Sequence, residues 1–564
     1  MNRTIQGADA VEKVWKPEPQ LLESLVSAVP DVLSSQKENG RFGTEPWICG
    51  DQNVLLPLAA AWALEESPYY HHPEVLSAIV RGGDALINAQ DEQGMWTFRK
   101  KDHSTWGQIL MPWTYSRWIR AYHLVRDAMS DDARERWERA LLLGFEGISR
   151  TALHRVHNIP AHHAMGLYCA GLVFGRDDWK AQAQTFMGEV VEAQSSYGWW
   201  SEHFGPVVSY NFVYSDALGV YYRLSEDERV LEALEHAARY HASYTYPDGS
   251  AVETVDERNP HHGGVRLGNP GFSHTPAGRG YLARQHALHL KTGKRFDADY
   301  AAGLLLYGGE GPIEETAAGQ DRHMVRMGDQ AMIVRRRPWF LSLSAFICEP
   351  PDNRWVQDRQ NLVSVFHDRT GLIVGGGNTK LQPLWSTFTV GDPSLLKHTP
   401  GDEDPDFHPT GPLIHVPDRA SIRLDEDAPG LLLRYGQETC NVILIPRSET
   451  ELNLIFEATT HSGMPVEAHL TLMPHLDRPL CFASGEHIRM GEEPFGWSGD
   501  GDASWIEHAG WRLSLPRGAC VLWPVLPHNP YRKGGEATVE EARLVVALSF
   551  SPTVSRYELT LDIL

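Results

Sequence analysis

The chain has 564 residues, with 51 Lys and Arg against 73 Asp and Glu, so its formal net charge is −22. Hydrophobic residues make up 42% of the sequence and charged residues 22%, which is typical of a folded globular protein and excludes wholesale disorder. No run approaches the ~20 consecutive apolar residues that a transmembrane helix needs. The acidic balance argues against nucleic acid and against an anionic membrane as partners, because both require a basic surface.

Six cysteines lie far apart and form no CxxC pair: Cys49, Cys169, Cys348, Cys440, Cys481 and Cys520. This spacing excludes a zinc ribbon and a thioredoxin-type motif, and it predicts buried, small hydrophobic side chains. The first residues lack the apolar run of a signal peptide. We therefore expect a cytoplasmic protein, or a periplasmic or secreted one if a leader has been trimmed.

The N-terminal half has the periodicity of successive amphipathic helices. Within residues 116–129, Trp118, Tyr122, Val125 and Met129 recur at helical spacing, and the segments around Trp137 and Trp179 repeat the pattern. Loops rich in Gly, Pro and Asp separate the helices, among them 91–106. Further helices are predicted over 73–90, 162–174, 209–224 and 227–244. Many helices of this length predict an α/α toroid over residues 1–315, with a helical solenoid as the alternative.

The C-terminal half consists of short runs rich in Val, Ile, Leu and Thr, bounded by turn residues. Strands are predicted over 331–336, 340–347, 361–367, 371–374, 430–435, 441–445, 452–457, 466–473, 511–515, 543–550 and 556–563. They predict an antiparallel β-sandwich over residues 325–564, with 391–417 as a surface loop. The fold class is therefore α+β multidomain, an N-terminal (α/α) toroid followed by a C-terminal antiparallel β-sandwich.

Two polar clusters interrupt the apolar pattern of the helical half. The first surrounds Asn158, and Pro160 predicts that Asn158, His162 and His163 lie on a loop that enters a helix. The alternative is that these groups only cap that helix. The second cluster joins two tryptophans, whose flat faces suit sugar rings, to two tyrosines that share a helical face. Its residues are Trp199, Trp200, Glu202, His203, Tyr210 and Tyr214, for which core packing is the alternative.

A third cluster lies in a long loop of the helical half and combines carboxylates, an arginine and two histidines: Glu253, Asp256, Glu257, Arg258, His261 and His262. Loops of this kind often carry function, although a solvated charged turn is the simpler interpretation of Asp256 and Glu257. There is no P-loop, dinucleotide fingerprint, Gly-x-Ser-x-Gly or HExxH motif.

The order of these features resembles the heparinase II/III-like and alginate-lyase polysaccharide lyases. The resemblance covers the layout of nearly the whole chain and two or three short motifs, among them Gly-Trp-Trp-Ser-Glu followed by Ser-Tyr-x-x-x-Tyr. It implies that Asn158 and Tyr210 or Tyr214 are site residues. The sequence departs from the family in that His157 precedes Asn158. The resemblance also places Arg354 near the rim of the substrate cleft.

A uronate lyase needs a donor for the carboxylate, a base for the C5 proton and an acid for the leaving oxygen. We predict that Asn158, with Arg258 or a protonated histidine, neutralises the carboxylate. His162 or His163 would take the proton, and Tyr210 or Tyr214 would serve as acid, or as base for the opposite C5 configuration. The predicted substrate-binding residues are Trp106, Trp199, Trp200, Glu202, His203, Arg258, His261, His262 and Arg354.

The predicted partner is an anionic oligo- or polysaccharide, and no cofactor is required. The resemblance also leaves room for a structural zinc, because some family members carry one. The histidines that could converge to bind it are His261, His262, His274, His367, His398 and His408. A glycoside hydrolase that uses Glu202 and Asp256 is the main alternative function. A non-catalytic glycan-binding protein is the third. The glycan, endo or exo action and the oligomeric state stay open.

Overall fold

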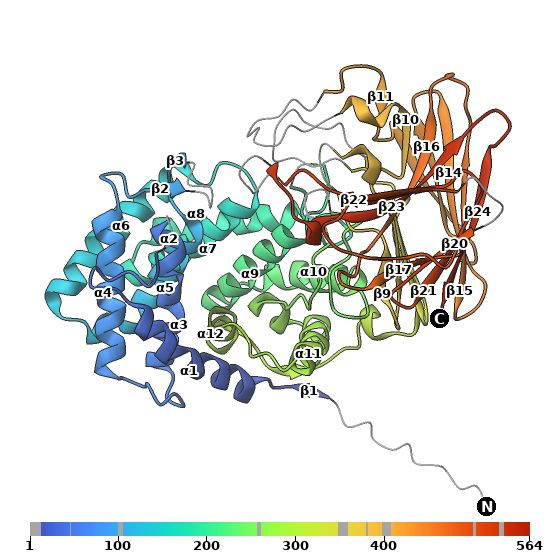
Figure 1. The fold of residues 1–564 in the computed structure, drawn as a ribbon. Coiled ribbons are helices and arrows are strands. Elements are labelled where there is room, and N and C mark those ends of the chain that lie inside the picture. The colour runs from blue at the N-terminus through green and yellow to red at the C-terminus, as the bar shows by residue number, and fades with distance from the viewer. Residues whose placement is uncertain are drawn as a thin grey trace, which may run out of the picture. The chain divides into compact units, whose positions relative to one another are not determined.

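The computed structural model describes residues 13–44, 47–99, 105–202, 204–256, 261–347, 359–378, 382–396, 408–499, 504–529 and 535–564. The chain divides into two compact units, one mainly helical and one mainly of strands (Figure 1). Unit 1 comprises Met1–Trp199, Ser209–Ala242 and Leu267–Thr316. Unit 2 comprises Trp200–Val208, Ser243–Arg266 and Ala317–Leu564. Two segments of the helical half of the sequence therefore group with the strands.

Unit 1 is built from helices, with two short antiparallel strand pairs. β1 (Val14–Trp15) pairs with β4 (Gly311–Pro312), and β2 (Trp96–Arg99) pairs with β3 (Thr105–Ile109). The second pair lies where the sequence predicted only a loop. The helices are α1 (Glu18–Ser35), α2 (Ile48–Asp51), α3 (Leu55–Ala63), α4 (Pro73–Ala89), α5 (Pro112–Val125), α6 (Asp131–Thr151), α7 (Asn158–Phe174), α8 (Asp177–Glu192), α9 (Val208–Ser225), α10 (Leu231–Ser243), α11 (Pro276–Lys291) and α12 (Ala298–Tyr307).

Helices α5, α7 and α9 lie side by side and run in the same direction. Trp113 stacks on His162 where α5 and α7 begin, and Tyr122 stacks on Phe174 where they end. In the same way Tyr168 of α7 contacts Tyr221 of α9. Because α6 and α8 connect the end of one of these helices to the start of the next, they must run back in the opposite direction. Successive helices that alternate in direction in this way fit the predicted α/α toroid.

The apolar periodicity of the sequence accounts for the core of unit 1. Trp118 of α5 and Trp137 of α6 are buried and meet edge to face, with ring centroids 5.6 Å apart. Local signals set the helix ends: Ser130 caps α6 by accepting from the Ala133 N–H, and α7 ends at Gly175 with a φ of 66°. No helix in the described part of the chain is long and apolar enough to span a membrane.

Unit 2 contains two large sheets, and all the strand pairs in its described residues are antiparallel. The described strands of the first sheet number 11: β5 (Arg322–Met327), β6 (Ala331–Arg336), β7 (Trp339–Ser344), β8 (Val363–His367), β9 (Gly371–Val374), β10 (Phe388–Gly391), β11 (Leu413–Ile414), β16 (Val466–Leu472), β19 (Phe495–Ser498), β22 (Cys520–Val525) and β23 (Arg543–Phe550). Most follow the order β19-β22-β23-β16-β9-β8-β7-β6-β5, and β10 pairs with β16 and β11.

The second sheet has nine described strands in the order β12-β13-β14-β15-β24-β21-β20-β17-β18. They are β12 (Arg419–Arg423), β13 (Gly430–Tyr435), β14 (Glu438–Pro446), β15 (Glu451–Ala458), β17 (Pro479–Phe482), β18 (His487–Arg489), β20 (Ser504–His508), β21 (Trp511–Leu515) and β24 (Arg556–Ile563). One hydrophobic cluster takes side chains from both sheets, for example Leu341 and Leu470 from the first and Leu454 and Leu559 from the second. The predicted sandwich is thus confirmed.

The cysteines occupy both units without forming disulfides in the described residues. Cys49, Cys169 and Cys440 are buried, as predicted, and burial raises the pKa of the Cys49 and Cys169 thiols to about 12. Cys481 and Cys520 are only half-buried, which differs from the prediction. Cys348 lies outside the described residues.

Candidate active site

Asn158 is the first residue of α7, so it stands at the start of the helix and not on the loop that the sequence predicted. It is 5% exposed, and its side-chain Nδ2 lies 3.4 Å from Nδ1 of His157. His157 provides no side-chain cap for the helix. Because the first N–H groups of a helix have no acceptor inside it, Asn158 lies beside backbone donors that point away from α7.

His162 and His163 lie one turn further along α7, in the interior of unit 1. Nε2 of His162 is 2.8 Å from Oγ of Ser116. Burial, assisted by Arg120 and Arg117, lowers the pKa of His162 well below its usual value, and burial lowers that of His163 to about 3. Both shifts of pKa favour the neutral form of the ring. Both side chains are buried, which does not favour the prediction that one of them takes the substrate proton or meets the carboxylate as a cation.

Tyr210 and Tyr214 share a face of α9 but differ in accessibility. Tyr210 is half-buried in the first turn of the helix, whereas Tyr214 is 0% exposed in its middle. Since α7 and α9 are parallel neighbours, their first turns lie at the same end of the helix pair, which is the end of Asn158. Burial of Tyr214 does not favour its predicted role as acid, and Tyr210 is the more accessible of the two tyrosines.

A charged cluster of unit 1 was not predicted as part of a site. Arg117 of α5 makes a two-pronged contact with Asp299 of α12, with Nε–Oδ1 at 2.9 Å and Nη2–Oδ2 at 2.5 Å. Arg120, also on α5, is buried and lies over the ring of Tyr307, 5.2 Å from its centroid. The sequence did contain a signal for this cluster, namely two arginines three residues apart in an otherwise apolar helix. Arginines that are buried in such a helix require partners.

In unit 2 the third cluster is anchored on a buried carboxylate. Glu253 accepts the Gly376 N–H at 3.0 Å and the Tyr246 hydroxyl at 2.8 Å. That hydroxyl also lies 2.6 Å from Oγ of Ser364, and burial with the nearby Glu253 raises the pKa of Tyr246 far above its usual value. Nδ1 of His261 is 3.8 Å from Glu253. His262, the next residue, is exposed.

Asp256 and Glu202, the predicted hydrolase pair, are both buried in unit 2. Oδ2 of Asp256 accepts the Val208 N–H at 3.0 Å, at the start of α9, and its carbonyl accepts from Asn378 at 2.7 Å. These contacts give Asp256 a structural role in holding the segment that precedes α9. The simpler interpretation of Asp256 as part of a solvated charged turn is therefore wrong, because the residue is buried.

The remaining predicted residues differ in how they are placed. Trp200 is buried in unit 2, so its face is covered by protein and not offered to a sugar, while Trp199 in unit 1 is half-buried. His203, Arg258 and Arg354, the side chain of Trp106 and the possible zinc ligand His398 lie outside the described residues. Within the described residues no three His, Cys, Asp or Glu side chains converge as a metal site.

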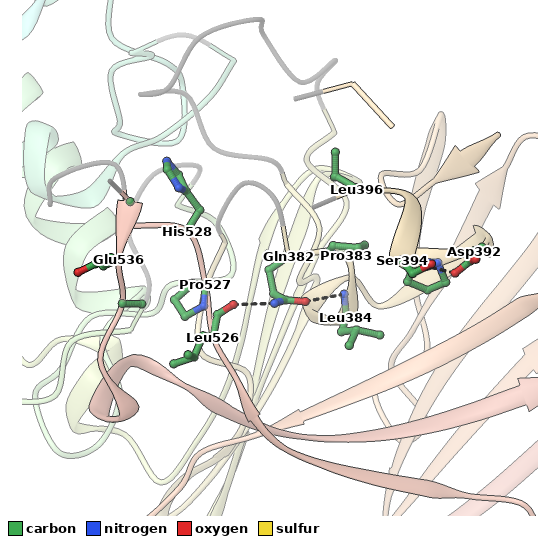
Figure 2. A pocket seen from close by; sticks show the side chains of 13 residues that line it. Gln382, Pro383, Leu384, Asp392, Ser394, Leu396, Leu526, Pro527, His528 and Glu536 are labelled. Carbon is green, nitrogen blue, oxygen red and sulfur yellow. Dashed lines mark hydrogen bonds between the residues drawn. The ribbon is translucent and has the colours of Figure 1, made fainter. Parts of the chain in front are cut away.

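A separate cavity of about 750 Å³ lies in unit 2 (Figure 2). Proline and leucine side chains form much of its wall. Gln382 spans one side, donating to the Leu526 carbonyl at 2.6 Å and accepting from the Leu384 N–H at 3.3 Å. Asp392 accepts the Ser394 N–H at 2.9 Å. The side chains of Gln382 and Asp392 are thus engaged with the protein's own backbone.

Comparison with solved structures extends over nearly the whole chain. The chondroitin AC lyase of Streptomyces coelicolor A3 matches with a TM-score of 0.54 and 14% identity, covering 97% of this chain and 80% of that one. Heparinase III matches with a TM-score of 0.53 and 11% identity over 100% and 88% of the two chains. A xanthan lyase from Paenibacillus gives 0.53 and 11%, over 97% and 58%.

No protein-family model matches the chain, and no curated protein matches it in sequence. TM-scores of 0.50–0.54 establish a common fold, whereas identities of 10–14% leave the chemistry to be argued from the residues. The chain therefore has the fold of these polysaccharide lyases, an α/α toroid followed by an antiparallel β-sandwich.

Proposed function

We propose that this protein is a polysaccharide lyase that cleaves a uronic-acid-containing glycan by β-elimination. The observation that carries the proposal is the placement of Asn158 and Tyr210 in the first turns of two parallel, neighbouring helices, α7 and α9. The fold supports it, because the structural neighbours are lyases by name, of chondroitin, heparin and xanthan.

The reaction requires groups that stabilise the negative charge developing on the substrate carboxylate, in addition to a base. When the C5 proton leaves, its electron pair forms the C4–C5 double bond, the C4–O4 bond breaks, and O4 takes up a proton. Negative charge develops on the uronate carboxylate in the process. The Asn158 amide, in the first turn of α7, supplies a donor for that charge.

Tyr210 is the group proposed to move the proton. A tyrosine can take the C5 proton as phenolate and can protonate the leaving oxygen as phenol, so one residue can serve both steps. His162 and His163 are not needed in this scheme, and it requires no metal or organic cofactor. An anionic oligo- or polysaccharide remains the proposed substrate.

The hydrolase alternative is not favoured by any contact in the described residues. It needs two carboxylates that reach a glycosidic bond or its water, whereas Asp256 is bonded to the backbone before α9 and Glu202 is buried.

Product chemistry distinguishes the functions. The enzyme is incubated with a panel of uronic-acid polymers and with the same polymers after reduction of their carboxyl groups to alcohols. β-Elimination predicts a product that absorbs ultraviolet light, formed from at least one acidic polymer and not from its reduced form. New reducing ends without this absorbance would show a hydrolase, and binding without cleavage would show a glycan-binding protein.

A further inference from the structure

Another cavity, of about 370 Å³, lies in unit 1. The loop before α2, the start of α2, the end of α4 and strand β2 form its wall. A volume of this size is typical of a site for a small ligand. Its lining combines an indole with amides, a hydroxyl and two guanidinium groups, which is the chemistry that an acidic sugar requires: Asn39, Arg41, Trp47, Asn88, Thr97 and Arg99.

The cavity carries positive charge in a chain whose net charge is −22. None of its described lining residues is Asp or Glu. Arg41 pairs with Asp51, whose Oδ2 lies 2.9 Å from Nε, but the Asp51 side chain is 2% exposed and that of Arg41 is 25% exposed. Arg99 is exposed and has no hydrogen bond or ion pair among the described residues. A ligand in the cavity therefore meets guanidinium groups and no carboxylate, which favours an anion.

The wall of the cavity is held in place by the protein itself. The Arg41 N–H donates to Oδ1 of Asn39 at 3.1 Å, and this bond fixes the turn that carries both side chains. Trp47 is half-buried and meets Phe98 of β2 edge to face, with ring centroids 4.5 Å apart. An indole that is held in this way suits the apolar face of a sugar ring, while arginine donors suit its acidic group.

The cavity and Asn158 flank α5 at the end where that helix begins. On one side the Thr114 hydroxyl donates to the carbonyl of Cys49 at 3.3 Å, in the helix α2 that borders the cavity. On the other side Trp113 stacks on His162, one turn after Asn158. Since packed helices lie about 8–10 Å apart, two such steps place the cavity on the order of 20 Å from Asn158. Only an oligosaccharide can reach both places.

We propose that this cavity binds a second acidic sugar of the glycan that reacts at Asn158 and Tyr210. The proposal rests on the proposed function and adds that the substrate is a chain held at two places. Arg99, with Arg41, binds the carboxylate or sulfate group of that sugar, and Trp47 packs against its ring. Binding far from the bond that breaks lowers KM and leaves kcat unchanged. The enzyme should therefore prefer long chains to short ones.

The first test measures binding and does not depend on turnover. Long and short size fractions of chondroitin sulphate and of other uronic-acid polymers are titrated into the Tyr210→Phe protein, alone or combined with Arg99→Ala or Arg139→Ala. Arg139 is an exposed arginine of α6, so its loss changes the net charge equally. Arg99→Ala should weaken the binding of long chains about tenfold, and Arg139→Ala should leave it unchanged. Equal affinities of these two variants, or no binding of any acidic chain, overturn the second site.

Chemically modified chains identify the acidic group that Arg99 binds. Reduction of the carboxyl groups should remove the difference in affinity between Arg99→Ala and its parent if the group is a uronate. Removal of the sulfate groups should do so if it is a sulfate ester. A difference that survives both treatments would show that Arg99 binds no acidic group, which contradicts the proposal.

Turnover separates the second site from the lyase proposal. On long chains Arg99→Ala should raise KM about tenfold with kcat unchanged, and on the shortest chain that is cleaved it should match the wild type. An unchanged KM on long chains contradicts the second site and leaves the lyase proposal intact. If no glycan gives an ultraviolet-absorbing product, the lyase proposal fails, and the binding experiment still decides whether the cavity holds an acidic sugar.

Discussion

Nδ1 of His162 lies 4.0 Å from Oδ2 of Asp216, and together with the contact of Tyr168 and Tyr221 this shows the register in which α7 and α9 run side by side. The first turns of both helices lie N-terminal to this contact, and they contain Asn158 and Tyr210. The same register leaves Tyr214 in the buried middle of α9. Of the five predicted catalytic residues, only Asn158 and Tyr210 lie in the first turns of these two helices.

Removing the Asn158 amide should slow the reaction without unfolding the protein. Asn158→Ala takes away a donor for the charge that develops on the carboxylate, and losing one such donor typically lowers kcat by ~10²–10³-fold. Gln184→Ala, in an exposed position of α8, is the matched control and should keep the wild-type rate. Steady-state rates of the two variants on the best polymer decide the point. Equal rates would remove Asn158 from the mechanism.

Acid should destabilise unit 1 through its buried histidines. Burial lowers the pKa of His163, His241 and His286 to about 3 each, so the unfolded state binds their protons more tightly below about pH 6.5. Their stabilisation is present at neutral pH and is lost as pH falls, by about 2 kcal/mol per histidine at about pH 5.

His241→Phe tests this dependence, because the ring stacks on Phe212 and a phenyl group can replace it. Denaturant unfolding of this variant should show a smaller loss of free energy between neutral and acid pH than the wild type. His487→Gln, an exposed position in β18, should retain the full loss. The same loss in His241→Phe and wild type would contradict the assignment of a buried neutral ring.

Glu253 should contribute to the stability of unit 2. Glu253→Ala deprives the buried Gly376 N–H and the Tyr246 hydroxyl of an acceptor, which costs ~1–3 kcal/mol per unsatisfied group. Glu486→Ala, at an exposed turn, should change the free energy of unfolding very little. Chemical denaturation of both variants is the measurement, and equal stabilities would show that the Glu253 cluster does not hold its loop.

Substitution of Gly376 should destabilise the protein through a clash with the Arg543 side chain as well as through backbone strain. Its φ is +120°, and a Cβ there would come within 1.9 Å of Nε of Arg543. Gly463 also has a positive φ, +73°, but has no atom within 4 Å of such a Cβ. Gly376→Ala should therefore lower the melting temperature more than Gly463→Ala. The reverse order would show that Arg543 moves aside freely.

Local pattern was sufficient to predict most of the fold. The strands of 331–336, 430–435 and 556–563 were predicted to the residue, because apolar runs end there at turn residues. The start of α4 at Pro73 was predicted equally well. The hairpin of β2 and β3 was not, because Gly, Asp and charged residues made 91–106 look like a plain loop.

The site was only partly predictable, because its contacts join distant parts of the chain. Asn158 and Tyr210 stood out as polar residues in apolar surroundings. Arg117 finds its partner Asp299 182 residues later, and Tyr246 meets Ser364 118 residues later. No periodicity shows such pairs. Nor could spacing show that His162 turns toward Ser116 and into the core.

The most direct measurement for the lyase proposal is the rate of ultraviolet-absorbing product formation by Tyr210→Phe beside Tyr197→Phe. Tyr197 is an exposed tyrosine of the same unit, so its variant makes the same chemical change away from α9. Tyr210→Phe should lose ~10²–10⁴-fold in kcat with substrate binding and melting temperature preserved, while Tyr197→Phe stays at the wild-type rate. Near-normal turnover by a folded Tyr210→Phe enzyme would contradict the account.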